Sequence, residues 1–268
     1  MAEESFHEAW LKRFGYPFDG TPPDIAHLLR HRSVRSFDRS REVPEETVRA
    51  LVGAAQSAST SSNLQLWSVI SVQEPGRREA IAKLCADQAH VREAHWFFSF
   101  LVDHHRLRAA ALAAGENPSG LDYVEYFIMG LVDAALAAER MVCAAEALGL
   151  GVCYIGALRN DAQGVADILA LPDGTFGAFG LCLGWPSHEA RAEIKPRLHP
   201  DSIWFRERYA PDVDVSEYNE RMRSFYDSQG MNPGVTWAMR SGRRVDDHHL
   251  TGREALKEFL LRRGFNRR

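Results

Sequence analysis

The amino-acid sequence predicts a globular protein that combines helices and strands, and three observations support this. The chain has 268 residues, a length that suits one large domain or two small ones. Hydrophobic residues make up 45% and charged residues 25%, an ordinary balance for a protein with a large core. Short apolar runs alternate along the chain with segments of helical periodicity.

The first half of the chain gives clear signals for each element. Residues 43–58 predict a helix, because Pro44 suits a first turn and Glu45 and Glu46 favour the positive helix end. Residues 59–63, Ser-Thr-Ser-Ser-Asn, break this helix, and residues 66–73 have strand composition. We expect a helix at 76–88, a buried strand at 96–103, and a helix followed by a loop over 105–122.

The segment 123–148 predicts a long helix with small or apolar residues on almost every side. Such a helix must be buried all round, so it is either the centre of the domain or part of a subunit interface. Charges at Asp133, Glu139, Arg140 and Glu146 favour a buried helix over a membrane span. Gly149 ends it.

The second half predicts two more buried strands, at 151–158 and 176–186, with a short helix at 166–172 between them. Beyond residue 196 the chain is more polar. Its amphipathic stretches 215–230 and 252–265 predict helical arms that pack on the body or on a second subunit.

Composition narrows the possible partners and the compartment. The formal net charge is −4, so the chain has no general attraction to nucleic acid or to an anionic membrane. The four cysteines lack close C-x-x-C spacing, which fits reduced thiols in the cytosol. The first ten residues are acidic and lack an apolar stretch, which argues against a secretory signal. We therefore expect a cytoplasmic protein.

Two basic clusters could bind an anion. In an extended His31-Arg32-Ser33-Val34-Arg35 segment, His31, Ser33 and Arg35 would share one face, as suits a phosphate or a carboxylate. Lys195 and Arg197 flank a rigid proline after a strand and could clamp a dianion. The alternative for both clusters is ordinary solvated surface charge.

Two further segments could line a polar ligand. The loop of Ser59, Ser61, Ser62, Asn63 and Gln65 offers hydroxyls and amides, although such residues are also common in plain turns. The run Tyr154, Ile155, Gly156 and Ala157 places a glycine after a buried strand, where it permits close backbone approach or a tight turn. Gln88 and His90 are more simply read as structural residues when taken alone.

Familiar catalytic and metal motifs were not found. The sequence lacks G-x-S-x-G, H-E-x-x-H, the P-loop pattern and a G-x-G-x-x-G after a strand. The adjacent pairs His104-His105 and His248-His249 cannot share a helix face, so we expect both at the surface and predict no metal site, with metal binding by these pairs as the alternative.

Six motifs in order nevertheless resemble one family. HRSVRSF, SASTSSNLQLWSVI, DQAHV, AAEALGLGVCYIGALRN, FGLCLGWP and KPRL resemble the flavin-dependent nitroreductase superfamily, in its oxygen-insensitive, NADPH–flavin oxidoreductase branch. The resemblance runs from about residue 31 to residue 197 and more weakly to the end. It implies an α+β fold with a mostly antiparallel sheet, an intertwined homodimer, and one domain over 1–268 whose residues 198–268 form the helical arms.

The resemblance also implies FMN as a non-covalent cofactor and assigns residues to it. The FMN phosphate and ribityl chain would meet His31, Arg32, Ser33, Lys195 and Arg197, and Arg35 would lie at the pyrimidine end. The ribityl and ring would be lined by Ser59, Ser61, Asn63 and Gln65, with Gln88 and His90 at the ring edge and the backbone of Tyr154, Ile155, Gly156 and Ala157 along the isoalloxazine.

The implied activity is that of an FMN-dependent NAD(P)H oxidoreductase with ping-pong kinetics. Nitroaromatics, quinones or flavin would accept the electrons, and no protein residue would act as acid, base or nucleophile because the cofactor carries the chemistry. A same-fold enzyme with a dedicated substrate stays open, such as a natural-product dehydrogenase, a dehalogenase or a flavin-fragmenting enzyme. So does a non-enzymatic flavin-binding module.

The sequence departs from the family pattern near its C-terminus. NADPH-preferring members carry arginines where this chain has Gln229 and residues 231–234, which predicts a weak preference for NADPH unless Arg240, Arg243 or Arg244 substitutes. Asn63 stands in place of a phenylalanine beside the flavin and, with Ser62, would give a polar acceptor pocket. Arg253 aligns with an arginine that reaches the substrate.

Overall fold

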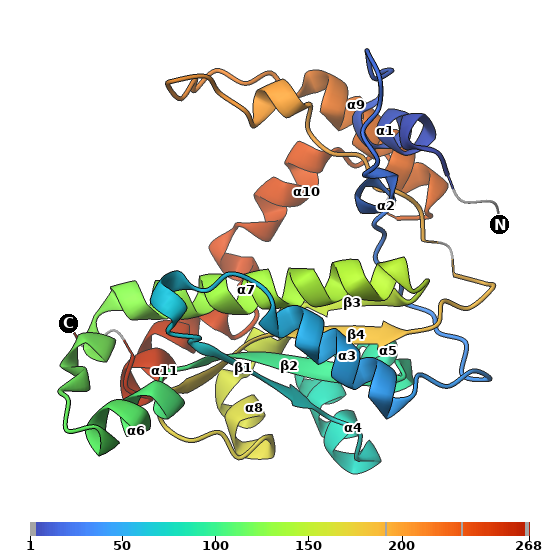
Figure 1. Ribbon diagram of the computed structural model, residues 1–268. Helices are drawn as coiled ribbons and strands as arrows, with labels where there is room; N and C mark the ends of the chain where they lie inside the picture. Colours follow the sequence, from blue (N-terminus) through green and yellow to red (C-terminus); the bar gives the residue numbers. More distant parts are fainter. Residues whose placement is uncertain (1–3, 191, 232, 266–267) are drawn as a thin grey trace. The chain divides into compact units, whose positions relative to one another are not determined.

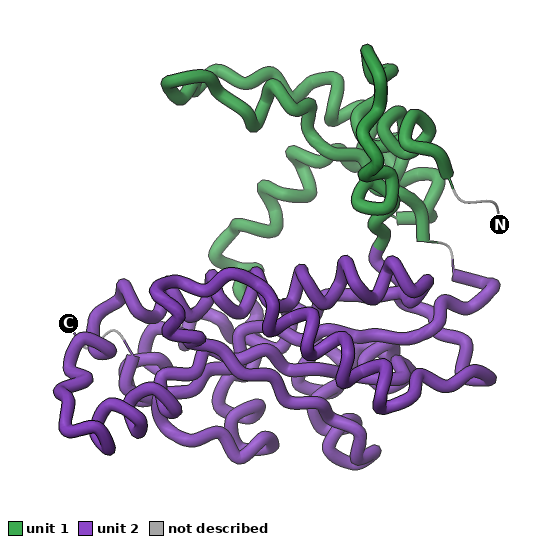
Figure 2. The backbone as a smooth tube through the Cα atoms, in the orientation of Figure 1, with its two compact units in different colours: residues 1–32, 191–250 green, residues 33–190, 251–268 purple. Residues whose placement is uncertain are grey.

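The computed structural model describes residues 4–190, 192–231, 233–265 and 268, and these divide into two compact units. Unit 1 comprises residues 1–32 and 191–250, and unit 2 comprises residues 33–190 and 251–268 (Figure 2). The boundaries differ from the predicted arms at 198–268, because the first 32 residues join the tail and the last 18 join the body. That the whole chain forms one domain stays a prediction.

Unit 2 is built around a four-stranded sheet in the order β1-β2-β4-β3, and all of its paired strands are antiparallel (Figure 1). A bulge between Phe100 and Leu101 shifts the register of β2 against β4. The strands are β1 (Trp67–Ser71), β2 (Trp96–Asp103), β3 (Gly151–Ile155) and β4 (Thr175–Gly184). The helices are α3 (Glu45–Gln56), α4 (Pro75–Leu84), α5 (Ala89–Glu93), α6 (His105–Ala113), α7 (Val124–Ala147), α8 (Ala162–Ile168) and α11 (Leu256–Arg262).

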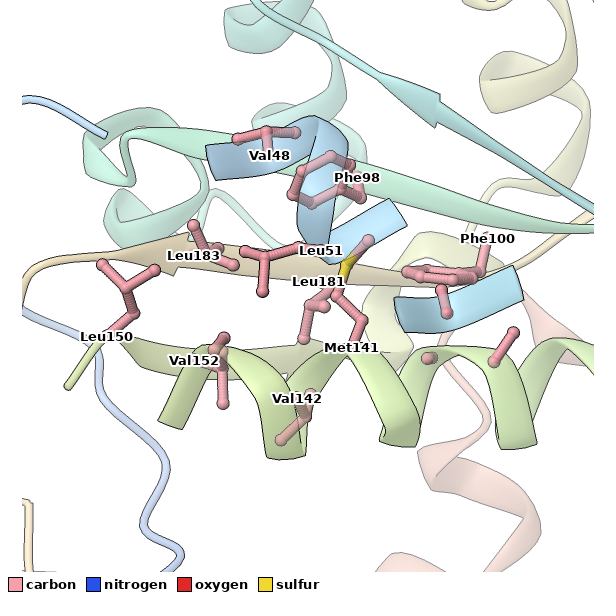
Figure 3. Packing of buried hydrophobic residues seen from close by; sticks show 14 of the residues in the cluster. Val48, Leu51, Phe98, Phe100, Met141, Val142, Leu150, Val152, Leu181 and Leu183 are labelled. Carbon is pink, nitrogen blue, oxygen red and sulfur yellow. The ribbon is translucent and has the colours of Figure 1, made fainter. Parts of the chain in front are cut away.

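Helices cover both faces of this sheet. In Figure 1, α3 and α7 lie on one face, and α4 and α8 lie on the other. The α3/α7 side holds the large apolar cluster of Figure 3, in which Leu51 and Met141 pack with Phe98, Phe100 and Leu181 of the sheet. Almost every residue of β2 and β4 is buried, as expected for strands whose sheet is covered on both faces.

The helix α7 is buried on one side only. Ala134, Ala137, Ala138 and Met141 are fully buried against the sheet and α3. Four apolar side chains spaced four residues apart are 45–50% exposed along the opposite side: Val124, Ile128, Val132 and Leu136. The prediction of burial on every side is therefore not met among the described residues, and a subunit interface on the exposed side stays a prediction.

Unit 1 contains α1 (Phe6–Phe14), α2 (Ala26–Leu29), α9 (Ser216–Ser228) and α10 (Trp237–Arg244). A capping box between Ser5 and Glu8 starts α1. The small core of unit 1 consists of Tyr218, Met222 and Tyr226 of α9 with neighbouring partly buried apolar side chains.

Most predicted elements are confirmed, with three corrections. The helix before β4 begins at Ala162, where the Asp161 side chain accepts the Gly164 N–H, and not at residue 166. Helices α1, α2, α5 and α10 were not predicted. The surface position of His104 is wrong, because this residue is 1% exposed and its ring packs edge-on against Phe265.

Two expectations about environment can be compared with the structure. All four cysteines are free. In the part of the chain that the structure describes, no helix combines the length and apolar character needed to cross a bilayer.

Candidate functional site

A buried arginine joins the two basic clusters within unit 1. The Arg13 side chain, on a residue only 5% exposed, donates hydrogen bonds to the carbonyls of Leu29 (2.6 Å), His31 (2.9 Å) and Lys195 (2.9 Å). Charged donors to carbonyls make strong hydrogen bonds, and buried carbonyls need partners. The segments around residues 31 and 195 therefore meet at one guanidinium, although 164 residues separate them in sequence.

The second basic cluster opens onto a cavity of unit 1. Lys195 and Arg197 line a cavity of about 370 Å³ together with two arginines of α10, Arg240 and Arg244. Aromatic and small side chains complete the lining: Tyr218, Met222, Tyr226, Trp237 and Ser241. The lining contains four cationic side chains and no carboxylate, so the cavity favours an anion.

In unit 2, the segment after Arg32 runs alongside β3. Ser33 forms a parallel bridge with Val152, and the Val34 N–H donates to the Val152 carbonyl at 2.8 Å. The Val34 side chain is buried, which leaves Ser33 and Arg35 on the opposite face, as the alternation of an extended segment predicts.

The charge of Arg35 acts on His90, which lies 55 positions further along the sequence. Burial, with the Arg35 charge as the second cause, lowers the pKa of His90 below its usual value. His90 is consequently neutral at physiological pH and can donate or accept a hydrogen bond. Gln88, half-buried, precedes the first residue of the same short helix, α5.

The polar loop after α3 has an unusual backbone that a buried carboxylate holds in place. Ser62, Asn63 and Gln65 have φ values of 49°, 56° and 51°, in the left-handed region that non-glycine residues rarely adopt. The fully buried Asp133 of α7 accepts the N–H groups of Ser61 (3.1 Å) and Leu66 (3.0 Å), at the two ends of this turn. The buried carboxylate therefore fixes the conformation of this loop. The loop exposes the side chains of Ser59, Ser61, Ser62, Asn63 and Gln65.

The end of β3 forms a third part of unit 2 that could contact a ligand. Ile155 and Ala157 are buried, and Gly156 between them starts a 3-10 turn. A Cβ at Gly156 would meet only Arg159 Nη2, at an ordinary 3.6 Å, so packing among the described residues does not require glycine there. This open space beside the Gly156 backbone is suited to the approach of a flat ligand.

The Arg253 side chain forms hydrogen bonds with this same turn. Its Nη2 donates to the Gly156 carbonyl and its Nε donates to Asn160 Oδ1, both at 3.0 Å. The tight approach of Gly252 to Asn160 brings it there: a Cβ on Gly252 would lie 2.2 Å from the Asn160 carbonyl oxygen. That Arg253 reaches a substrate stays a prediction. The hydrogen bond from Arg253 to the Gly156 carbonyl holds this peptide in position.

Sequence reasoning missed two residues that organise these surfaces. Asp133 was noted only as a charge that interrupts an apolar helix, and Arg13 was not noted at all. A carboxylate inside an otherwise apolar helix was the available signal for Asp133, because a buried charge needs hydrogen-bond partners. Nothing in the sequence around Arg13 indicated its burial.

Comparison with known proteins identifies the class. The sequence model described as "Nitroreductase family" matches residues 28–185, which is more than half of the chain, and "Nitroreductase family, C-terminal domain" matches residues 195–268. The chain therefore belongs to the nitroreductase family. The predicted family and its α+β fold are confirmed.

Individual relatives match over most of their length. The chain is 34% identical over 250 residues to the FMN reductase (NADPH) of Bacillus subtilis, which covers 91% of this chain and 98% of the relative. It is similar to the solved structure of the NfrA1 nitroreductase of B. subtilis, with a TM-score of 0.84, 32% identity and coverage of 91% and 99%. It is also similar to the NADPH:FMN oxidoreductase of Vibrio harveyi complexed with NAD+, with a TM-score of 0.79, 30% identity and the same coverage.

Proposed function

We propose that this protein is an FMN-dependent NAD(P)H oxidoreductase. The observation that carries the proposal is the joining of the two basic clusters by Arg13 in a chain of the nitroreductase family. The relatives named as FMN reductase (NADPH) and NADPH:FMN oxidoreductase support the cofactor and the co-substrate. When bound, FMN would supply the transfer of one hydride, which carries two electrons, from a nicotinamide, and the passage of those two electrons to an acceptor.

The residues present fit the phosphate of FMN. A phosphomonoester carries about two negative charges at neutral pH. Lys195 and Arg197 offer two cations beside a cavity without carboxylates, and His31 and Arg32 lie on the segment that Arg13 ties to Lys195. Ser33 would add a hydroxyl donor. We assign these residues to holding the phosphate and orienting the ribityl chain.

Unit 2 carries the residues that we assign to the flavin ring. Arg35 would stabilise negative charge at the pyrimidine end, where a cation lowers the energy of the reduced state. The neutral His90, with Gln88, would hydrogen-bond at the ring edge. The loop fixed by Asp133 would present Ser59, Ser61, Asn63 and Gln65, and the Gly156 peptide held by Arg253 would lie along the ring with Tyr154, Ile155 and Ala157.

The proposed acceptors are electron-poor small molecules such as nitroaromatics, quinones or free flavin. Ser62 and Asn63 expose polar groups in their loop, which suits an acceptor with polar substituents. No protein acid or base is required, in keeping with the lack of a nucleophile motif. The free cysteines are consistent with a cytoplasmic location.

We also propose that the protein forms a homodimer through the exposed side of α7. Val124, Ile128, Val132 and Leu136 form an apolar stripe of a kind that soluble proteins usually cover with a partner. Replacing Val132 and Leu136 together by arginine should give a monomer in size-exclusion chromatography with light scattering. Leu112→Arg, at a 61% exposed apolar position on α6, is the matched control and should leave the dimer intact.

Anaerobic stopped-flow spectroscopy tests the activity. The purified protein should be yellow, and NADPH, NADH or both should bleach the bound flavin within seconds. Subsequent addition of a quinone should restore the colour. A yellow protein that neither nicotinamide bleaches would contradict the enzyme assignment and favour a flavin-binding module.

A further inference from the structure

An arginine of helix α6 anchors the far end of the polar loop that follows α3. Arg106 Nη2 donates to the carbonyls of Gln65 (2.6 Å) and Trp67 (2.8 Å). The Leu66 carbonyl between them accepts the Asp103 N–H of β2 at 3.0 Å. Successive carbonyls of a strand point in opposite directions, and β1 lies at the edge of the described sheet. Arg106 therefore binds the two carbonyls that face away from the neighbouring strand.

A buried carboxylate holds the Arg106 guanidinium group in position. Asp103 Oδ2 accepts from Arg106 Nη1 at 3.2 Å and from the Ser68 hydroxyl at 2.5 Å, and Asp103 Oδ1 accepts the Arg106 N–H at 3.0 Å. Because Asp103 is only 8% exposed, its attraction for Arg106 is stronger than that of a solvated carboxylate. The two opposite charges balance each other, so Arg106 serves as an anchor for peptide groups and not as a site for an anion.

The anchored peptide belongs to a turn whose side chains are linked to each other. Gln65 and Asn63 have φ values of 51° and 56°, and a left-handed backbone of this kind persists only where the surrounding structure holds it. Gln65 Nε2 donates to Asn63 Oδ1 at 3.3 Å. A continuous series of contacts thus runs from Arg106 through the Gln65 peptide and its side-chain amide to Asn63.

This last hydrogen bond determines which part of the Asn63 side chain is available to a ligand. An asparagine amide has one carbonyl oxygen, which accepts, and one NH2 group, which donates. The oxygen accepts from Gln65, and none of the described residues accepts from Asn63 Nδ2. Asn63 is exposed. The loop therefore presents an N–H donor, which suits an electron acceptor that carries a carbonyl or nitro oxygen.

We propose that Arg106 is a positioning residue that, through Gln65, orients Asn63 to donate a hydrogen bond to the oxygen of a quinone or nitro acceptor. The inference rests on the proposed function, since it names how that enzyme recognises its acceptor. Negative charge develops on this oxygen as the acceptor is reduced, and a hydrogen bond to a charged oxygen is stronger than one to a neutral oxygen. Arg106 itself does not touch the acceptor.

The test compares two electron acceptors on the same variants. 1,4-Benzoquinone offers carbonyl oxygens, whereas ferricyanide takes electrons one at a time by outer-sphere transfer and needs no oriented hydrogen bond. Steady-state assays, normalised to bound FMN, give kcat/KM for each acceptor in Arg106→Met, Asn63→Ala and the double variant. Arg108→Met is the matched control, because Arg108 belongs to the same helix but pairs with Asp122. Hydrogen exchange of residues 59–66 in the flavin-free protein measures the loop without catalysis.

Arg106→Met and Asn63→Ala should each lower kcat/KM for benzoquinone by about fivefold, the usual effect of one hydrogen bond. The double variant should lose no more than the larger single loss, because both substitutions remove the same hydrogen bond. The values for ferricyanide, and both values in Arg108→Met, should stay within about twofold of wild type. Exchange of residues 59–66 should be faster in Arg106→Met and unchanged in Arg108→Met.

Several results would overturn the proposal. These are an unchanged kcat/KM for benzoquinone in Arg106→Met, equal losses for both acceptors, additive losses in the double variant, or unchanged hydrogen exchange in Arg106→Met. A wild-type protein that neither nicotinamide bleaches would refute the proposed function instead, and the exchange measurement would still test whether Arg106 anchors the loop.

Discussion

A single methyl group at Gly156 should separate ligand binding from folding. The backbone of Gly156 lies outside the left-handed region, and the new Cβ of Gly156→Ala would meet only Arg159 Nη2 at 3.6 Å. Folding should therefore be unaffected, or gain about 0.4–1 kcal/mol because alanine restricts the unfolded chain. If the flavin ring lies against this peptide, the methyl group should weaken FMN binding by about 1–3 kcal/mol, the usual cost of overpacking, or about 5- to 150-fold.

The matched control is Gly180→Ala on the neighbouring strand β4. A Cβ there would lie 2.6 Å from Phe97 Cζ and 3.1 Å from Ile155 Cβ, inside the core. This variant should lose about 1–3 kcal/mol of unfolding free energy. Substitution of Gly156 should therefore weaken FMN binding without loss of stability, whereas substitution of Gly180 should lower stability.

Two measurements decide the outcome. Urea unfolding of the flavin-free proteins gives the change in stability, and quenching of FMN fluorescence gives the dissociation constant. Wild-type FMN affinity in Gly156→Ala would refute the placement of the ring against this turn. A loss of stability as large as that of Gly180→Ala would show that glycine at 156 is a requirement of the fold.

Three further predictions follow from polar groups that are buried or partly buried. In Asp133 each carboxylate oxygen accepts a different backbone N–H group, and Asp133→Asn replaces one of these oxygens by an NH2 group that cannot accept. The substitution should cost about 1–3 kcal/mol of unfolding free energy, measured by urea unfolding, and should weaken FMN binding. Unchanged stability and affinity would contradict the role of this carboxylate. Arg253→Met removes the hydrogen bonds to Gly156 and Asn160 and should lower the melting temperature of the flavin-free protein by about 3–12 °C, whereas an unchanged value would argue against this anchor. Burial lowers the pKa of both His90 and His104, so the unfolded chain binds more protons than the folded chain. The unfolding free energy should therefore fall as the pH drops below about 6.5, by up to about 1.4 kcal/mol per pH unit for each histidine. Urea unfolding between pH 5 and 7.5 measures this dependence, and a flat profile would show that neither histidine resists protonation.

The local signals in the sequence were sufficient for most of the fold. The apolar run 96–103 coincides with β2, and the long helix 123–148 coincides with α7 within one residue at each end. Periodicity and helix-end residues act locally, so they can be read directly. Helix α10 was missed because its apolar residues are few and its lining face is cationic.

The candidate site depended on contacts that no local pattern encodes. The charge effect of Arg35 on His90 and the bonds from Arg13 to His31 and Lys195 join residues far apart in sequence. Their residue types were visible, but only the family resemblance placed them on one ligand. His104 shows the opposite failure, because a polar residue beside a second histidine was assumed to be exposed and instead fills a core position.

The central claim is that paired cations hold FMN by its phosphate, and comparison with riboflavin tests it most directly. Riboflavin lacks the phosphate, so wild-type protein should bind FMN at least about tenfold more tightly, and Arg197→Ala should reduce that ratio severalfold or more while changing riboflavin affinity little. Riboflavin binding as tightly as FMN, or an Arg197→Ala variant that weakens both ligands equally, would contradict the account.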